Sequence, residues 1–85
     1  MEDIEFRYDT QLLIEGKQLN ENKIREYFEK QLKGDCLIAV GDDELIKIHF
    51  HTNEPWKVLE YCAMLGEIHD IVVEDMIRQS KGLQG

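Results

Sequence analysis

Two histidines separated by one residue, His49 and His51, are the side chains of this sequence best suited to chemistry. They end a segment of alternating polar and apolar residues, 44–51 (ELIKIHFH), which predicts a β-strand. Residues two apart in a strand point to the same face, about 7 Å apart, so both imidazoles can reach one metal ion. The strand expected beside this one carries Asp9 on its polar face. Together the three side chains suit Zn²⁺ or another divalent transition metal.

A histidine pair of this kind is a short motif, and polar residues on a solvated sheet face need no function. Lys47 lies on the same predicted face, and its positive charge counts slightly against a metal. If a metal is bound, its activated water could also make Asp9, His49 and His51 a small hydrolytic or phosphoryl-handling site. Three interpretations therefore stay open: a non-catalytic metal module, a hydrolytic site, and a purely structural interaction domain.

The other chemically capable side chains have simpler explanations. His69 could join the site from the last strand, but it is in phase with Ile71 and Val73, so we expect an ordinary partly buried histidine. The acidic run 42–44 lacks the spacing of a calcium loop and indicates a turn. Trp56 could pack at the edge of the core or form part of an interface, and we expect core packing. Cys36 and Cys62 are expected to be small buried hydrophobic side chains in a reduced compartment.

The segments that must position these residues follow the order β-α-β-β-α-β. The expected elements are a strand over 4–14, a helix over 20–33, strands over 36–40 and 44–51, a helix from 53 or 54 to 65, and a strand over 68–74; a helical turn and frayed tail follow over 76–85. This order predicts one α+β domain over 1–85, a ferredoxin-like sandwich with two helices on one face of a four-stranded antiparallel sheet. The first and third strands are then central neighbours, which brings Asp9 beside the histidines.

The composition, and the motifs that the sequence lacks, argue against several classes of function. The net charge is −8, from 10 basic and 18 acidic residues, which argues against nucleic acid as a partner. No apolar run approaches the roughly 20 residues of a membrane span, and the acidic start does not resemble a signal peptide, so we expect a cytoplasmic protein. The sequence has no phosphate-binding loop, so we expect no kinase activity from this chain alone.

The stretch 34–55 (GDCLIAVGDDELIKIHFHTNEP), with Tyr8-Asp9-Thr10 and Asp75-Met76, resembles the middle domain of the dihydroxyacetone-kinase-like proteins. These include the A subunit of bacterial fatty acid kinase. The resemblance covers nearly the whole chain, and the pattern K-x-H-x-H-T-N-x-P is fairly specific. It implies a domain associated with dimerisation and with a Cys/His cluster that looks like a metal site. The family's histidines match His49 and His51, and its cysteine falls on Asp9.

The resemblance also implies a larger assembly, in which an ATP-binding domain and a domain that meets a fatty-acid-binding protein are the partners. Two departures stand out: Asp9 is a harder, less zinc-selective ligand than cysteine, and Trp56 replaces the usual glycine after the proline. Residues and resemblance together lead us to expect a non-catalytic metal-binding and dimerisation module. Its ligands would be His49, His51 and Asp9, and its default symmetry a homodimer.

Overall fold

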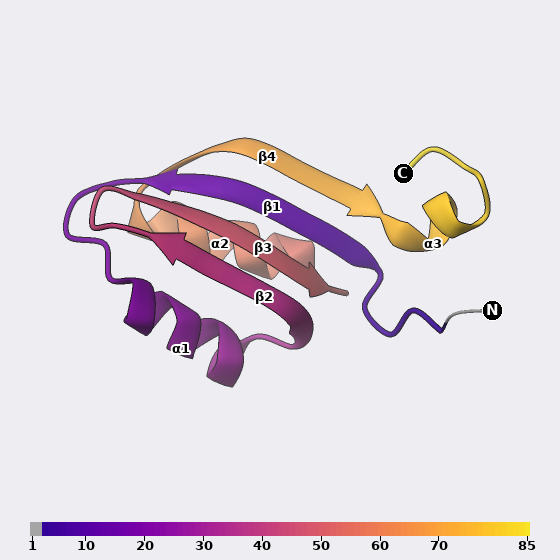
Figure 1. The fold of residues 1–85 in the computed structure, drawn as a ribbon, viewed down its shortest axis with the longest axis horizontal. Coiled ribbons are helices and arrows are strands. Elements are labelled where there is room, and N and C mark those ends of the chain that lie inside the picture. The colour runs from indigo at the N-terminus through magenta and orange to yellow at the C-terminus, as the bar shows by residue number, and fades with distance from the viewer. Residues whose placement is uncertain (1–2) are drawn as a thin grey trace.

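The computed structural model describes residues 3–85, which contain a four-stranded sheet. The elements in chain order are β1 (Tyr8–Glu15), α1 (Glu21–Gln31), β2 (Gly34–Gly41), β3 (Leu45–Thr52), α2 (Pro55–Leu65), β4 (Glu67–Asp75) and α3 (Met76–Ser80). The strands lie in the order β2-β3-β1-β4, and each neighbouring pair is antiparallel (Figure 1). The predicted ferredoxin-like α+β fold is confirmed, including the central position of the first and third strands.

One face of the sheet carries the core, because alternate residues of β1 and β3 point toward the helices. Phe28 of α1 is fully buried and meets Phe50 of β3 edge-on, with ring centroids 5.0 Å apart. The buried apolar residues are Leu12, Ile14, Leu19, Ile24, Phe28, Ala39, Ile46, Ile48, Phe50, Val58 and Cys62. The opposite face is called the open face below. Its central strands bear Asp9, Gln11, Leu13, Lys47, His49 and His51.

Local sequence signals set the starts of both long helices. Asn20 caps α1, because its Oδ1 accepts a hydrogen bond from the Lys23 amide at 3.0 Å. Leu19 and Ile24 on either side of this cap are buried, as expected of a hydrophobic staple. Pro55 occupies the first turn of α2, where its missing N–H removes no helical hydrogen bond. The predicted helices are confirmed, with ends that differ by one or two residues.

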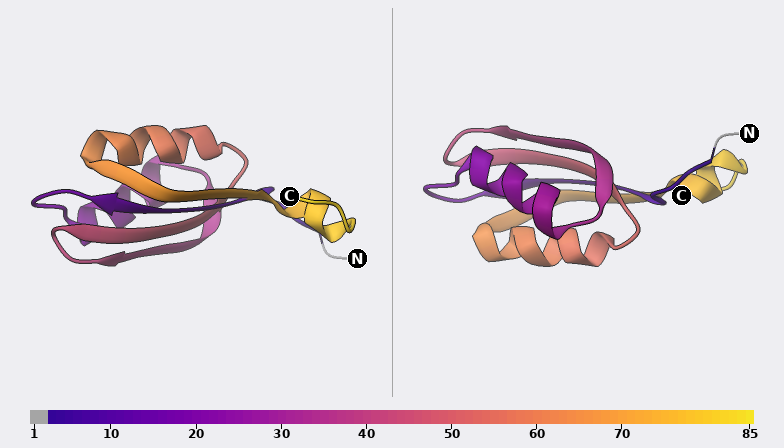
Figure 2. Two further views of the ribbon diagram at one scale, coloured as in Figure 1. Left: turned by 90° about the horizontal axis from the view of Figure 1, so that it is seen from above. Right: turned by 90° about the horizontal axis from the view of Figure 1, so that it is seen from below.

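Short α3 and residues 3–7 extend from the same end of the sheet (Figure 2). Asp75 caps α3 and also accepts hydrogen bonds from Nε and Nη2 of Arg7, at 2.9 and 2.7 Å. The Arg7 amide donates to the side chain of Asn53 at 2.8 Å instead of joining a strand ladder. The first strand therefore begins at Tyr8. The start at residue 4 that the alternating sequence predicts is wrong.

A bulge in β2 corrects the prediction for Cys36. Between Asp35 and Ile38 this strand has one residue more than the facing part of β3. Leu37 packs against the core, and Cys36, with a φ of 54°, is left exposed. The expectation of a buried Cys36 is therefore wrong. Cys62 is buried as predicted, and burial raises the pKa of its thiol to about 12.

The expectation that Trp56 packs at the core edge is also wrong, because its side chain is 59% exposed. The residues of α2 that face the core are Pro55, Val58 and Cys62. Each helical residue is rotated by about 100° from the one before it, so the position after Pro55 points away from the sheet. Trp56 is thus a surface side chain at the beginning of the helix.

A second bulge lies in β4, where the register against β1 shifts before Leu13. Asp70 has a φ of 53° at this point. The extra residue places His69 opposite Leu13 on the open face and Val73 on the other face. The expectation that His69 is in phase with apolar neighbours such as Val73 is therefore wrong, although the side chain is partly buried as predicted.

Candidate metal centre

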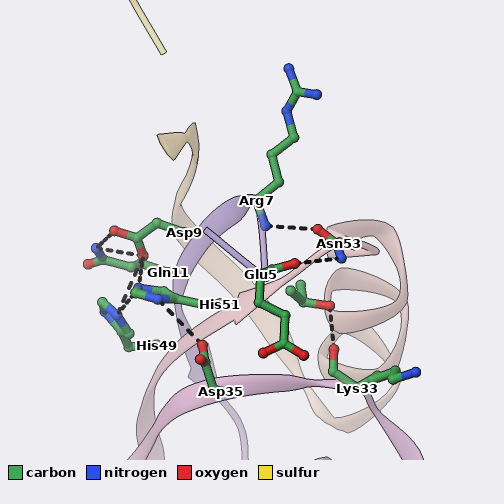
Figure 3. A network of polar contacts seen from close by, with 10 residues as sticks. Glu5, Arg7, Asp9, Gln11, Lys33, Asp35, His49, His51 and Asn53 are labelled. Atoms are coloured by element: carbon green, nitrogen blue, oxygen red, sulfur yellow. Dashed lines mark hydrogen bonds and ion pairs between the residues drawn. The ribbon is translucent and has the colours of Figure 1, made fainter. Parts of the chain in front are cut away.

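The central strands bring three donor side chains together on the open face (Figure 3). Asp9 of β1 lies directly opposite His51 of β3 in the antiparallel register. His49 is two residues before His51 and therefore points to the same side of the sheet. The structure thus places the three residues singled out from the sequence in one cluster.

The donor atoms of this cluster converge on a common point. His49 Nε2 and His51 Nε2 are 3.1 Å apart. Asp9 Oδ1 lies 3.6 Å from the first of these nitrogens and 3.8 Å from the second. The side chains are 19–22% exposed, so the cluster is partly shielded but open to solvent on one side.

These separations fit a bound transition metal. Zinc–nitrogen bonds of about 2.0–2.1 Å in tetrahedral geometry put neighbouring ligand atoms about 3.3 Å apart. The three observed distances, 3.1, 3.6 and 3.8 Å, lie close to that value. Two neutral imidazoles and one carboxylate also form a donor set that divalent transition metals accept. A fourth position would be left for water or for a ligand from a partner.

Two neighbouring residues support the donors. Gln11 lies two positions after Asp9, and its Nε2 donates to both carboxylate oxygens at 3.3 Å. Asp35 lies opposite His51 on the other flank, with Oδ1 at 3.7 Å from His51 Nδ1. The two nitrogens of the His51 ring therefore face two different carboxylates, as Figure 3 shows.

His69 does not join the cluster. It lies on β4 opposite Leu13, four residues along β1 from Asp9. Its Nδ1 is 3.0 Å from Asp70 Oδ1, and its Nε2 is 2.9 Å from Glu15 Oε1. The hydrogen bond to Asp70, followed by the one to Glu15, raises the pKa of His69 above its ordinary value.

The acidic run 42–44 forms the hairpin turn that its composition predicted. Oδ1 of Asp42 accepts hydrogen bonds from the amides of Glu44 and Leu45, at 2.9 and 3.0 Å. These bonds lower the pKa of the Asp42 carboxyl, because they favour its charged form. The carboxylate therefore serves the turn that aligns β2 with β3.

Gln11 and Asp35 were missed in the sequence. The position of Gln11 beside Asp9 could have been predicted, because both residues lie on the polar face of the predicted strand. Asp35 was hidden, since the strand was expected to begin after it, at residue 36. Only the observed start at Gly34, with the bulge that follows, places Asp35 beside the histidine pair.

The fold and the cluster define a small ferredoxin-like domain with a candidate metal site on its open sheet face. The chain belongs to the family of middle domains like that of the fatty acid kinase A subunit, whose family model matches residues 5–83. The resemblance inferred from the sequence is thereby confirmed. Across residues 3–85, no helix combines the length and the apolar character needed to cross a membrane.

The relatives are much longer proteins. Protein YloV of Bacillus subtilis (strain 168) is 35% identical over 80 residues, which are 92% of this chain and 14% of the relative. An uncharacterized protein of Staphylococcus aureus (strain USA300) is 32% identical over 84 residues, 94% of this chain and 15% of the relative. The chain therefore spans about a seventh of the length of the curated relatives it matches.

Proposed function

We propose that this domain binds one divalent transition metal ion, with Zn²⁺ the first candidate, through Asp9, His49 and His51. The observation that supports this most is the convergence of one oxygen and two nitrogens within 3.8 Å of one another. The role is non-catalytic: the domain would be a structural part of a longer fatty-acid-kinase-like chain. ATP binding and contact with a fatty-acid-binding protein would belong to other parts of that assembly.

Hydrogen bonding alone explains the cluster less well than a metal does. A bond between the two imidazoles accounts for the 3.1 Å contact of His49 with His51. The contacts of Asp9 at 3.6 and 3.8 Å are too long for hydrogen bonds. The register of β1 against β3 already brings the three side chains near one another, and a cation at the common point would attract all three donors at once.

The test is metal analysis of protein purified without a histidine tag, followed by titration against a chromophoric chelator. We expect one metal ion per chain, lost in His49→Ala and in His51→Ala and weakened in Asp9→Asn. His69→Ala is the matched control, because this histidine lies on the same face but outside the cluster. Metal-free wild-type protein after zinc loading, or equal loss of metal in His69→Ala, would contradict the proposal.

We also propose that two copies of the domain meet through the open face. Four exposed apolar side chains lie on that face: Ile38, which is opposite His49, and Val40 of β2, Leu45 of β3 and Val72 of β4. Such side chains favour burial, and a two-fold dimer would cover the same patch on both copies. The fourth metal position faces the same side, so a partner could reach it.

Sedimentation velocity over a concentration series tests this dimer. We expect Ile38→Lys to shift the protein toward monomer, because the change puts a charge into the patch. Met64→Lys is the matched control, since Met64 is 78% exposed but lies on α2, away from the open face. A wild-type protein that stays monomeric at all concentrations, or a dimer that Ile38→Lys leaves intact, would refute the contact.

A further inference from the structure

We propose that Asp35 is the positioning residue of this site: its carboxylate faces Nδ1 of His51, favours the proton on that nitrogen and so directs Nε2 toward the metal. The inference rests on the proposed metal binding. Asp35 Oδ1 lies 3.7 Å from His51 Nδ1, while Nε2 of the same ring faces Asp9 and His49. The ring is therefore flanked by a carboxylate on the side that would not bind the metal (Figure 3).

The carboxylate of Asp35 can determine which ring nitrogen of His51 carries the proton. A neutral ring carries one proton, on either Nδ1 or Nε2. Binding a metal through Nε2 requires the proton to reside on Nδ1. A carboxylate facing Nδ1 accepts a hydrogen bond from that N–H, which fixes the ring's tautomer and rotation and strengthens Nε2 as a ligand.

The backbone of β2 puts Asp35 in this position. Asp35 pairs directly with His51 across the β2–β3 ladder, so their side chains share the open face. The bulge begins immediately after Asp35, where Cys36 has a φ of 54°. Gly34, just before Asp35, lies so close to the His51 carbonyl oxygen and the Phe50 ring that a side chain there would find no room. The contact between Asp35 Oδ1 and His51 Nδ1, at 3.7 Å, is longer than a hydrogen bond. It would have to shorten by about 0.8 Å to become one.

Asp35 faces Nδ1 of His51, whereas Asp9 and His49 face Nε2, so Asp35 is placed to orient this ligand and not to bind the same ion. Cys36 lies close enough to offer another explanation, because Asp35, Cys36 and His51 have donor atoms within 4.8 Å of one another. In that case Cys36 would bind metal through its sulfur, and its removal would weaken binding. The two explanations therefore differ in what they predict for Cys36→Ser.

The experiment compares zinc affinities by chelator competition in Asp35→Ala, Asp35→Asn, Asp35→Glu and Cys36→Ser. Loss of such a supporting carboxylate typically weakens metal binding about 10- to 100-fold, which we expect for Asp35→Ala. Asp35→Asn should lose less, because its amide oxygen still accepts from Nδ1–H, and Asp35→Glu should recover part of the affinity. Cys36→Ser should bind as wild type does. Asp43→Asn is the matched control, since it removes the same charge at the distant hairpin.

A second readout does not depend on metal. Long-range ¹H–¹⁵N NMR spectra of the metal-free domain report the tautomer of His51. We expect Nδ1–H in the wild type and a shift toward Nε2–H in Asp35→Ala, whose dispersed spectrum would also verify folding. Wild-type affinity and tautomer in Asp35→Ala, or an equal loss of affinity in Cys36→Ser, would overturn the proposal. If the wild type binds no metal, the proposed function fails, and the tautomer still tests the Asp35 contact.

Discussion

Replacing Gly34 with alanine should destabilise the fold and the candidate metal centre together. A Cβ atom at this position would overlap the carbonyl oxygen of His51 and lie 2.5 Å from Cζ of Phe50. Comfortable carbon–carbon contact needs about 3.5 Å, so the ring or the strand would have to move by about 1 Å. The ring cannot yield easily, because it is buried edge-on against Phe28. We therefore expect β2 to separate from β3 at this end.

The cost of that separation has two parts. Overpacking of a core typically costs about 1–3 kcal/mol. A displaced β2 would also stretch the hydrogen bond that Thr52 Oγ1 donates to the Lys33 carbonyl, which is 2.8 Å long and contributes about 1 kcal/mol. The total is about 2–4 kcal/mol, a large share of the roughly 4–13 kcal/mol expected for a domain of 85 residues.

Urea unfolding of the chelator-treated protein measures this loss, and zinc titration of the folded fraction measures its effect on the site. Gly16→Ala is the control for the general effect of alanine on the unfolded chain, which is about 0.4–1 kcal/mol. A Cβ at Gly16 would lie 3.1 Å from the Leu19 side chain and 3.3 Å from the Leu65 carbonyl oxygen, which are milder contacts than those at Gly34. If Gly34→Ala unfolds at the same urea concentration as wild type, the steric argument is wrong.

Two further predictions concern the core and the pH dependence. Phe28→Ala should lower the free energy of unfolding by about 3–5 kcal/mol, because it empties the centre of the aromatic cluster with Phe50 and Tyr61; a loss below about 1.5 kcal/mol in urea unfolding would contradict this. The pKa of His69 is raised in the folded state by Asp70 and Glu15, so its contribution to stability is full below about pH 6.5 and is lost as the pH rises through the folded-state pKa. The stability advantage of wild type over His69→Gln should therefore be larger at pH 5.5 than at pH 8.5, and an advantage independent of pH would refute the assignment.

Much of the fold could be predicted because local signals and pattern agree. The alternation in 44–51 marks β3, and its pairing with β1 follows from the order of elements. Asn20 and Pro55 mark the helix starts through hydrogen-bonding chemistry that is local to each of them. The proximity of Asp9, His49 and His51 could be predicted from two facts alone: the order of the strands, and the alternation of side chains between the two faces of each strand.

The errors at Cys36, Asp35 and His69 share one physical cause, since the extra residue in a bulge breaks that alternation. In β2 the bulge leaves Cys36 outside the core and brings Asp35 into line with His51. In β4 the bulge at Asp70 turns His69 to the open face. Both bulged residues have positive φ, yet neither is glycine. Aspartate adopts this conformation more often than most residues do, but cysteine does not, and a single aspartate does not mark a bulge.

The donor cluster depends on the register of β1 against β3, and the core enforces that register. A slip by one residue would turn Asp9 toward the helices and bring its neighbour Thr10, which is fully buried, to the open face. The same slip would expose the apolar side chains of β1 that now lie beneath the helices, such as Leu12 and Ile14. Hydrophobic burial on one face therefore fixes the spacing of the three donors on the other. A metal at that spacing would stabilise the central pair in return, because it binds the folded arrangement and not the unfolded chain.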